Sequence, residues 1–153
     1  MKKELIAPCG MNCEICVAFL REKNPCPGCR RIDTKTAKTR LRCVVRDCSI
    51  LKDNNWMHCS DRCNEYPCKR LKSLDKRYRT KYRMSMLENL AMIKNQGMNA
   101  FLADQERKWT CPTCGSTICC HNGLCYNCQY DEVKARKSRL GWANDAKKQG
   151  KKK

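Results

Sequence analysis

The sequence contains little hydrocarbon from which to build a core. Leu, Ile, Val and Phe together supply 23 of its 153 residues, and its formal net charge at pH 7 is +18. This combination is typical of intrinsically disordered chains. Cysteine is the exception, with 16 residues. Because disulfides or metal ions can stabilise a fold that hydrophobic burial alone does not, the cysteines indicate a cross-linked, folded protein.

Segments for export or membrane insertion are also lacking. Only Leu5, Ile6 and Ala7 separate the charged first residues from Pro8, whereas an export signal needs roughly 7–15 apolar residues. No stretch approaches the ~20 apolar residues of a membrane span. We therefore expect a cytoplasmic protein with no membrane association, in which thiols stay reduced and clustered cysteines bind metal.

Residues typical of catalysis are scarce. There are two histidines, His58 and His121, and each is adjacent to a cysteine. The 15 carboxylates form no paired arrangement, and no glycine-rich phosphate loop is present. The sequence offers no catalytic residue, so enzymatic activity is not predicted. The enzyme-like alternative is a solvent-exposed leftover thiol activated by a nearby Lys or Arg.

The cysteines fall into two groups separated by a long gap. Ten belong to the first 68 residues and six follow residue 110. This layout predicts a small, metal-stabilised α+β protein with an irregular cysteine-rich domain. Its four predicted parts are a metal-binding domain (1–68), a helical connector packing on it (69–108), a zinc ribbon (109–130) and a basic, partly disordered tail (131–153).

The connector shows helical periodicity. We expect its first helix to begin near Pro67, because a first helical turn tolerates proline. Its apolar stripe, at spacings of three and four residues, consists of Leu71, Leu74, Tyr78 and Tyr82.

Capping residues delimit further helices. Ser85, with Glu88 three residues later, predicts a helix start, and Gly97 predicts its end. A third helix is expected over residues 98–108. In the N-terminal domain, Asn12 is placed to cap a short helix.

The strongest motif is a pair of CxxC knuckles in the C-terminal region. Cys111 and Cys114 form the first, and Cys125 and Cys128 form the second after ten intervening residues. Two such knuckles bring four thiolates together tetrahedrally at ~2.3 Å from a zinc ion. The sequence therefore predicts a zinc ribbon.

Three further residues between the knuckles admit three interpretations. Cys119, Cys120 and His121 can supply a substitute ligand, form part of a second site through Cys119 and His121, or act as ordinary side chains of the ribbon loop. Adjacent residues in an extended segment point to opposite faces, so Cys119 and Cys120 do not easily reach one ion. The last interpretation is favoured for Cys120.

The ten N-terminal cysteines allow several pairings. The knuckle of Cys26 and Cys29 can close one zinc site with Cys43 and Cys48. Six thiols then remain for a second site that needs four, unless His58 joins or a binuclear cluster shares sulfurs. These six are Cys9, Cys13 and Cys16, and Cys59, Cys63 and Cys68.

An iron–sulfur cluster is the alternative to zinc in this domain. The spacing of Cys9, Cys13 and Cys16 equals that of radical S-adenosylmethionine enzymes, but the region is too short for their α/β barrel and shows no βα alternation. We therefore do not predict that enzyme class. Thiolates nevertheless select both zinc and iron–sulfur centres, so we expect about three or more zinc ions, with an iron–sulfur cluster as the alternative.

Positive charge is distributed along the whole chain. Residues 1–66 carry a net +5, residues 67–109 carry +7, and residues 110–153 carry +6. Basic residues interleaved with tyrosines over 77–83 suit phosphate contacts with base stacking, although the apolar stripe assigns the same tyrosines to a buried face. A second cationic segment contains Lys134, Arg136, Lys137, Arg139 and the terminal lysines.

These features predict a zinc-binding module that presents a cationic surface to nucleic acid or an acidic protein. The alternative function is a redox or metal-handling protein that uses an iron–sulfur cluster or a reactive thiol.

Several segments resemble one family. Residues 6–16, 26–30 and 63–71 are similar to successive motifs of an uncharacterised prokaryotic cysteine-rich family, the domain of unknown function numbered 3795. The resemblance implies a zinc-binding protein and supplies no catalytic residue. Its longer members append a zinc ribbon, and residues 77–82, 88–90, 93–94 and 109–128 resemble them. One departure is that three residues separate Cys59 from Cys63 where the family pattern is closer to two, which makes His58 an alternative ligand.

Overall fold

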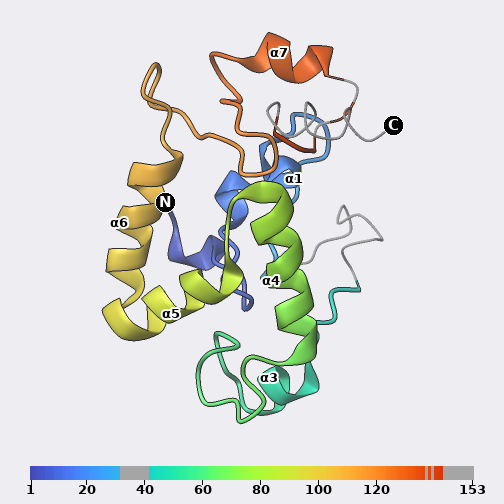
Figure 1. Ribbon diagram of the computed structural model, residues 1–153, viewed down its shortest axis with the longest axis vertical. Coiled ribbons are helices and arrows are strands. Elements are labelled where there is room, and N and C mark those ends of the chain that lie inside the picture. The colour runs from blue at the N-terminus through green and yellow to red at the C-terminus, as the bar shows by residue number, and fades with distance from the viewer. Residues whose placement is uncertain (32–41, 137, 139, 143–153) are drawn as a thin grey trace.

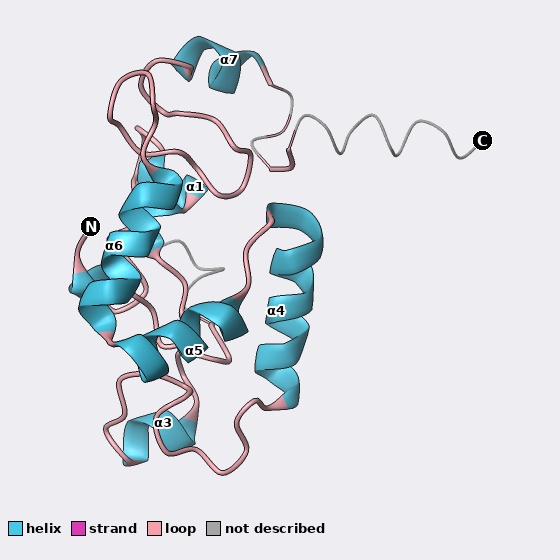
Figure 2. Cartoon of the chain, turned by 60° about the vertical axis from the view of Figure 1, so that its left-hand side comes forward, coloured by secondary structure: helices cyan, strands magenta, loops and turns pink. Residues whose placement is uncertain are grey.

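Helices form nearly all the regular structure of the protein (Figures 1 and 2). The computed structural model describes residues 1–31, 42–136, 138 and 140–142. In chain order the elements are the 3₁₀ helices η1 (Lys3–Leu5) and η2 (Cys13–Ile15), and the α-helices α1 (Val17–Leu20), α3 (Ser49–Asp53), α4 (Lys69–Tyr82), α5 (Met86–Gln96), α6 (Met98–Trp109) and α7 (Tyr130–Ala135).

Extended structure is limited to isolated antiparallel bridges in the described part of the chain. The predicted α+β class is therefore confirmed only for its helices and cysteine-rich character, and its β component is not confirmed. Backbone amides beside the cysteines donate hydrogen bonds within tight turns, as where Gly115 N–H donates to Cys111 O (2.8 Å). Because these amides are not available to a neighbouring strand, adjacent segments form single bridges in place of ladders. The bridges join Ile6 to Asn12, Thr110 to Thr117 and Ile118 to Cys125.

The core forms where the N-terminal segment meets helices α4, α5 and α6. Helix α5 packs against both α4 and α6. The predicted stripe of α4 is confirmed, because Leu71 and Tyr82 are buried and Leu74 and Tyr78 pack against the core. Core residues of the three helices and of the N-terminal segment include Leu5, Ala7, Met11, Ile15, Leu71, Met86, Leu90 and Trp109.

Backbone carbonyls of the N-terminal segment receive hydrogen bonds from four distant parts of the chain. Because the segment forms little helix or sheet of its own, its buried carbonyls need partners from elsewhere. The bonds run from Arg30 Nε to Ile6 O (2.6 Å), from Cys59 N to Pro8 O (2.9 Å), from Asn89 Nδ2 to Gly10 O (2.9 Å) and from Cys120 N to Ile15 O (2.9 Å).

Most predicted helix boundaries are confirmed. Ser85 Oγ accepts a hydrogen bond from Glu88 N (3.1 Å) at the start of α5, which ends at Gly97. Helix α6 continues one residue beyond the predicted range. Helix α4 begins later than predicted, because Cys68 is its N-cap and Pro67 precedes the cap.

The short helix expected after Asn12 is divided into two pieces. The Asn12 side chain accepts a hydrogen bond from Glu14 N (3.0 Å), which starts the 3₁₀ turn η2. Cys16 then adopts an extended conformation (φ −83°, ψ 133°) and caps α1. The prediction of a capped turn is confirmed, but a continuous helix is not.

No helix in the described ranges is both long enough and apolar enough to cross a membrane. The basic tail contains α7 near its start. Disorder was predicted for residues 150–153, which lie outside the described residues. Lys137 and Arg139 of the predicted cationic segment also lie outside them.

A buried carboxylate joins α4 to α5. Asp75 Oδ1 accepts hydrogen bonds from Ser85 Oγ (2.7 Å) and Leu87 N (3.1 Å), and its Oδ2 accepts one from Arg79 Nε (2.7 Å). Burial raises the pKa of Asp75, but the three hydrogen bonds outweigh burial and hold the pKa below its ordinary value. Asp75 therefore completes the N-terminal cap of α5 from a different helix.

We expect Asp75→Asn to destabilise the metal-loaded protein by about 2–4 kcal/mol, because an amide cannot satisfy the same three donors. The stabilisation by Asp75 is fully present above the ordinary carboxyl pKa of about 3.9 and is lost as the pH falls through the lower folded-state pKa. Urea unfolding at pH 7, where thiolate ligands keep their metal, should show this difference from wild type. Asp104→Asn, which removes the pair with exposed Arg107, should change stability by less than about 0.5 kcal/mol. Equal losses in the two variants would contradict this role.

Gly10 lies where the N-terminal turn meets α5. Its φ is +84°, and a Cβ atom there would lie 2.9 Å from both Met86 O and Leu90 Cγ. We expect Gly10→Ala to cost about 2–4 kcal/mol through strain and overlap. Gly97 has a similar φ of +87°, but a Cβ atom added there would meet no other atom within 4 Å, so Gly97→Ala should cost only about 1–2 kcal/mol. Thermal unfolding followed by circular dichroism measures both, and a smaller loss for Gly10→Ala would contradict the packing argument.

Candidate metal centre

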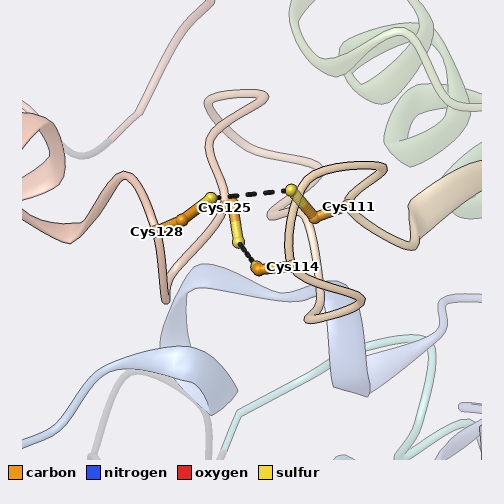
Figure 3. A group of neighbouring side chains, drawn as sticks. All are labelled: Cys111, Cys114, Cys125 and Cys128. Atoms are coloured by element: carbon orange, nitrogen blue, oxygen red, sulfur yellow. Dashed lines mark hydrogen bonds between the residues drawn. The ribbon is translucent and has the colours of Figure 1, made fainter.

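Four cysteine sulfurs converge in the C-terminal region (Figure 3). The Sγ atoms of Cys111, Cys114, Cys125 and Cys128 all lie within 4.8 Å of one another. Two of these separations are 3.6 Å, between Cys111 and Cys128, and 3.5 Å, between Cys114 and Cys125. A tetrahedral zinc site with bonds of about 2.3 Å has sulfur separations of about 3.8 Å. The predicted ribbon ligands therefore form a cluster that can hold a metal ion.

Two tight loops position these sulfurs. In the first loop, Cys111 N donates to Ser116 O (2.7 Å), and Ile118 N donates to Trp109 O (2.8 Å), which brings the two ends together. In the second loop, Asn127 N donates to the sulfur of Cys125 (3.4 Å). The buried Cys111 and Cys125 and the exposed Cys114 and Cys128 place the cluster at the protein surface.

Backbone amides favour thiolates in the first knuckle. The amide of Ser116, followed by the thiols of the second knuckle, lowers the pKa of Cys114 to about 6. Amides of Thr113 and Cys114 lower the pKa of Cys111. Hydrogen bonds with Cys114 and Cys111 raise the pKa of Cys128 to about 12. The knuckle amides thus prepare negative sulfur ligands for a cation.

His121 connects the ribbon to the N-terminal domain. Its Nδ1 accepts a hydrogen bond from Val17 N (3.4 Å), and its Nε2 lies 3.2 Å from Tyr78 Oη. Cys119 and Cys120 are fully buried beside it. Both ring nitrogens of His121 therefore face protein groups, which favours the interpretation of these three residues as side chains of the ribbon loop.

The ten N-terminal thiols are more dispersed. In the described part of the chain, three or more His, Cys, Asp or Glu ligand atoms lie mutually within 4.8 Å only at the four ribbon cysteines. The described N-terminal thiols therefore form no cluster as tight as the ribbon. Cys29 N donates to the sulfur of Cys13 (3.3 Å). Burial, followed by the charges of Cys29, Cys43 and Cys59, raises the pKa of Cys9 to about 12.

Two cavities divide most of the remaining N-terminal cysteines. Cys26, Cys29 and Cys43 line one groove. Cys48, which the sequence grouped with those three, instead lines a separate cavity with Cys59, Cys63 and Cys68. Cys16 lies apart from both cavities as the N-cap of α1.

His58 faces an arginine and a carboxylate. Its Nε2 lies 3.4 Å from Arg30 Nη2, and its Nδ1 lies 3.9 Å from Asp61 Oδ1. Burial and the charge of Arg30 lower the pKa of His58. The histidine that the sequence offered as an alternative ligand to Cys59 is thus engaged in a polar contact.

A cationic groove runs along α4. Its volume is about 860 Å³, and no described acidic residue lines it. The sequence did not single out Arg42 and Arg46, because only the tertiary structure brings them beside α4. Arg46 also pairs with Asp47 (2.7 Å). The cations lining the groove are Arg42, Arg46, Lys69, Arg70 and Arg77.

The tyrosines of α4 face the protein interior. The rings of Tyr78 and Tyr82 lie 5.0 Å apart, and Tyr82 lies 4.5 Å from the ring of His121. Of the two interpretations of residues 77–83, the structure supports a cationic helix with packed aromatics.

Comparison with known proteins places the N-terminal part in a family. Residues 5–73 match the family model described as protein of unknown function (DUF3795). The match ends within α4 and precedes the ribbon. No curated protein and no solved structure is significantly similar to the chain. The motifs at residues 6–16, 26–30 and 63–71 all lie within the match, and through it residues 5–73 belong to the DUF3795 family.

Proposed function

We propose that the chain is a zinc-binding module that presents the cationic groove along α4 to nucleic acid. The observation that carries the metal-binding part is the convergence of the four ribbon sulfurs within 4.8 Å. The groove, with its five cations, indicates the class of partner. An acidic protein is the alternative partner, because it offers the same charge.

Zinc is the ion that best suits the ribbon. Four thiolates select zinc or iron, and the short sulfur separations of 3.5 and 3.6 Å suit a single tetrahedral ion. Four protein ligands leave no open coordination position, which favours a structural role over a catalytic one. Structural zinc contributes roughly 10–16 kcal/mol in finger peptides, enough to stabilise a small loop-rich unit.

Phosphate contacts are the expected mode of nucleic-acid binding. Between Lys69 and Arg83 the single acidic residue, Asp75, is buried, so cations dominate the exposed side of α4. Since Tyr78 and Tyr82 pack inward, base stacking does not contribute, and we expect binding with little sequence preference. The exposed cations are Lys69, Arg70, Lys72, Lys76, Arg77, Arg79, Lys81 and Arg83.

The proposal extends to the N-terminal cysteines and to location. We propose that all ten N-terminal cysteines are metal ligands. We also propose that the four parts of the chain are divided after residues 68, 108 and 130. Reduced thiols are needed for these sites, so we also propose a cytoplasmic location. The alternative function is a redox role that uses an iron–sulfur cluster or a thiol. Metal analysis discriminates between an iron–sulfur protein and a zinc-binding module.

Cys114→Ser should reduce bound zinc by one equivalent per chain, because a closed site loses one of its four ligands. Thr113→Ala is the matched control, since this exposed side chain lies in the same knuckle and offers no thiol. Elemental mass spectrometry gives zinc per chain, and circular dichroism checks folding. Unchanged zinc in Cys114→Ser, or equal loss in the control, would contradict the ribbon site.

Binding to duplex DNA or RNA should weaken steeply with salt. The slope of log K against log salt is about −0.9 for each neutralised DNA phosphate. Arg42→Glu with Arg77→Glu should weaken binding and make the slope shallower by about one unit per lost phosphate contact. Lys94→Glu is the control, because it reverses a charge on α5 outside the groove. Fluorescence anisotropy measures each affinity.

Absence of binding to either nucleic acid at low salt would overturn the nucleic-acid part and favour the acidic protein. Equal weakening by Lys94→Glu and by the groove variant would show that net charge, and not the groove, governs binding.

A further inference from the structure

Four N-terminal cysteines line one cavity where α4 begins. The cavity has a volume of about 320 Å³, and the four are Cys48, Cys59, Cys63 and Cys68. We propose that these four thiols are the ligands of a second metal centre, separate from the ribbon. This inference deepens the proposed metal-binding function, but it rests on a different set of residues.

The fold fixes each of these cysteines by a different contact. Cys48 is the N-cap of α3 and Cys68 is the N-cap of α4. Between them, Cys59 N donates to Pro8 O (2.9 Å), and the carbonyl of Cys63 accepts a hydrogen bond from Tyr66 N (3.1 Å). The segment from residue 48 to residue 68 thus contributes all four of its cysteines to the lining of one cavity.

A metal ion accounts for four thiols on one cavity. Four thiolates that line the same cavity would repel one another without a cation, whereas a bound metal ion stabilises the deprotonated sulfurs.

Charges around the cavity offset the negative charge of such a centre. Four thiolates with one Zn²⁺ carry a net charge of −2. Lys69 and Arg70 line the wall, together with the acidic Glu65. The 14-residue helix α4 starts at the cavity, and the Cys68 side chain makes no capping hydrogen bond. The first-turn amides and the positive end of the helix dipole therefore lie beside Cys68.

Two kinds of metal group can be bound by four cysteines. Thiolate ligands bind zinc and iron–sulfur clusters. Among the described residues, these four sulfurs do not all lie within 4.8 Å of one another, whereas the ribbon sulfurs do. An iron–sulfur cluster suits wider separations between cysteine sulfurs, because iron and sulfide lie between them. The cavity is about ten times the ~30 Å³ share of a water molecule, so it accommodates either group. The metal analysis distinguishes the two.

The test uses the full chain, purified without oxygen. Cys63→Ser with Cys68→Ser should remove one zinc equivalent, or all the iron and sulfide with the visible absorbance, and leave the ribbon zinc in place. Cys114→Ser should do the reverse, so failure of the ribbon and failure of this centre are distinguishable. Ser49→Ala is the matched control, because Ser49 lines the same cavity without a thiol. A folded double variant that keeps all its metal would overturn the proposal.

Differential alkylation of the unchanged protein covers the case in which the double variant does not fold. Thiols are labelled with one isotope of iodoacetamide before metal removal and with another after it, and mass spectrometry locates each label. We expect Cys48, Cys59, Cys63 and Cys68 to be protected together and released together. Alkylation of any of the four in the metal-loaded protein, at the rate it shows after metal removal, would overturn the centre.

Discussion

Backbone carbonyls of residues 6–15 hold four distant parts of the chain together. These residues form one bridge and a short 3₁₀ turn, so their buried carbonyl groups must be satisfied from outside. Each donor comes from a different part of the chain, and the donors are Arg30, Cys59, Asn89 and Cys120. Since leaving a buried carbonyl unpaired costs about 1–3 kcal/mol, these contacts hold the cysteine-rich loops, α5 and the ribbon around one segment.

The ribbon is consequently part of the fold and not an appended unit. Cys120 bonds to the N-terminal segment, while His121 contacts both Val17 and Tyr78. Trp142 Nε1 donates to the carbonyl of Cys120 (2.9 Å), which fixes the chain beyond α7 to the same loop. A metal ion at the surface knuckles would therefore stabilise a loop whose inner side packs on the N-terminal domain and α4.

Helix α4 links the metal chemistry to the proposed partner. Its inner face contributes Leu71, Asp75 and Tyr82 to the interior, and its outer side carries the cations. The helix starts at Cys68, one of the four thiols of the second cavity, and Lys69 and Arg70 line both that cavity and the cationic groove. A metal ion at Cys68 would thus hold the first turn of α4 and, with it, the cations that face the partner.

Local features were readable from the sequence, because they depend on residues a few positions apart. The CxxC spacing identified the four cysteines that cluster in the ribbon, the Ser85 cap and Gly97 delimited α5, and the stripe from Leu71 to Tyr82 identified the buried face of α4. Long-range packing, in contrast, brings Asp75 to the cap of α5 and places Cys48 in one cavity with Cys59, Cys63 and Cys68. Loop-closure entropy changes only slowly with loop length, so spacing does not select among distant thiols. The fold makes that selection, through the bond from Cys59 N to Pro8 O and the positions of Cys48 and Cys68 at helix starts.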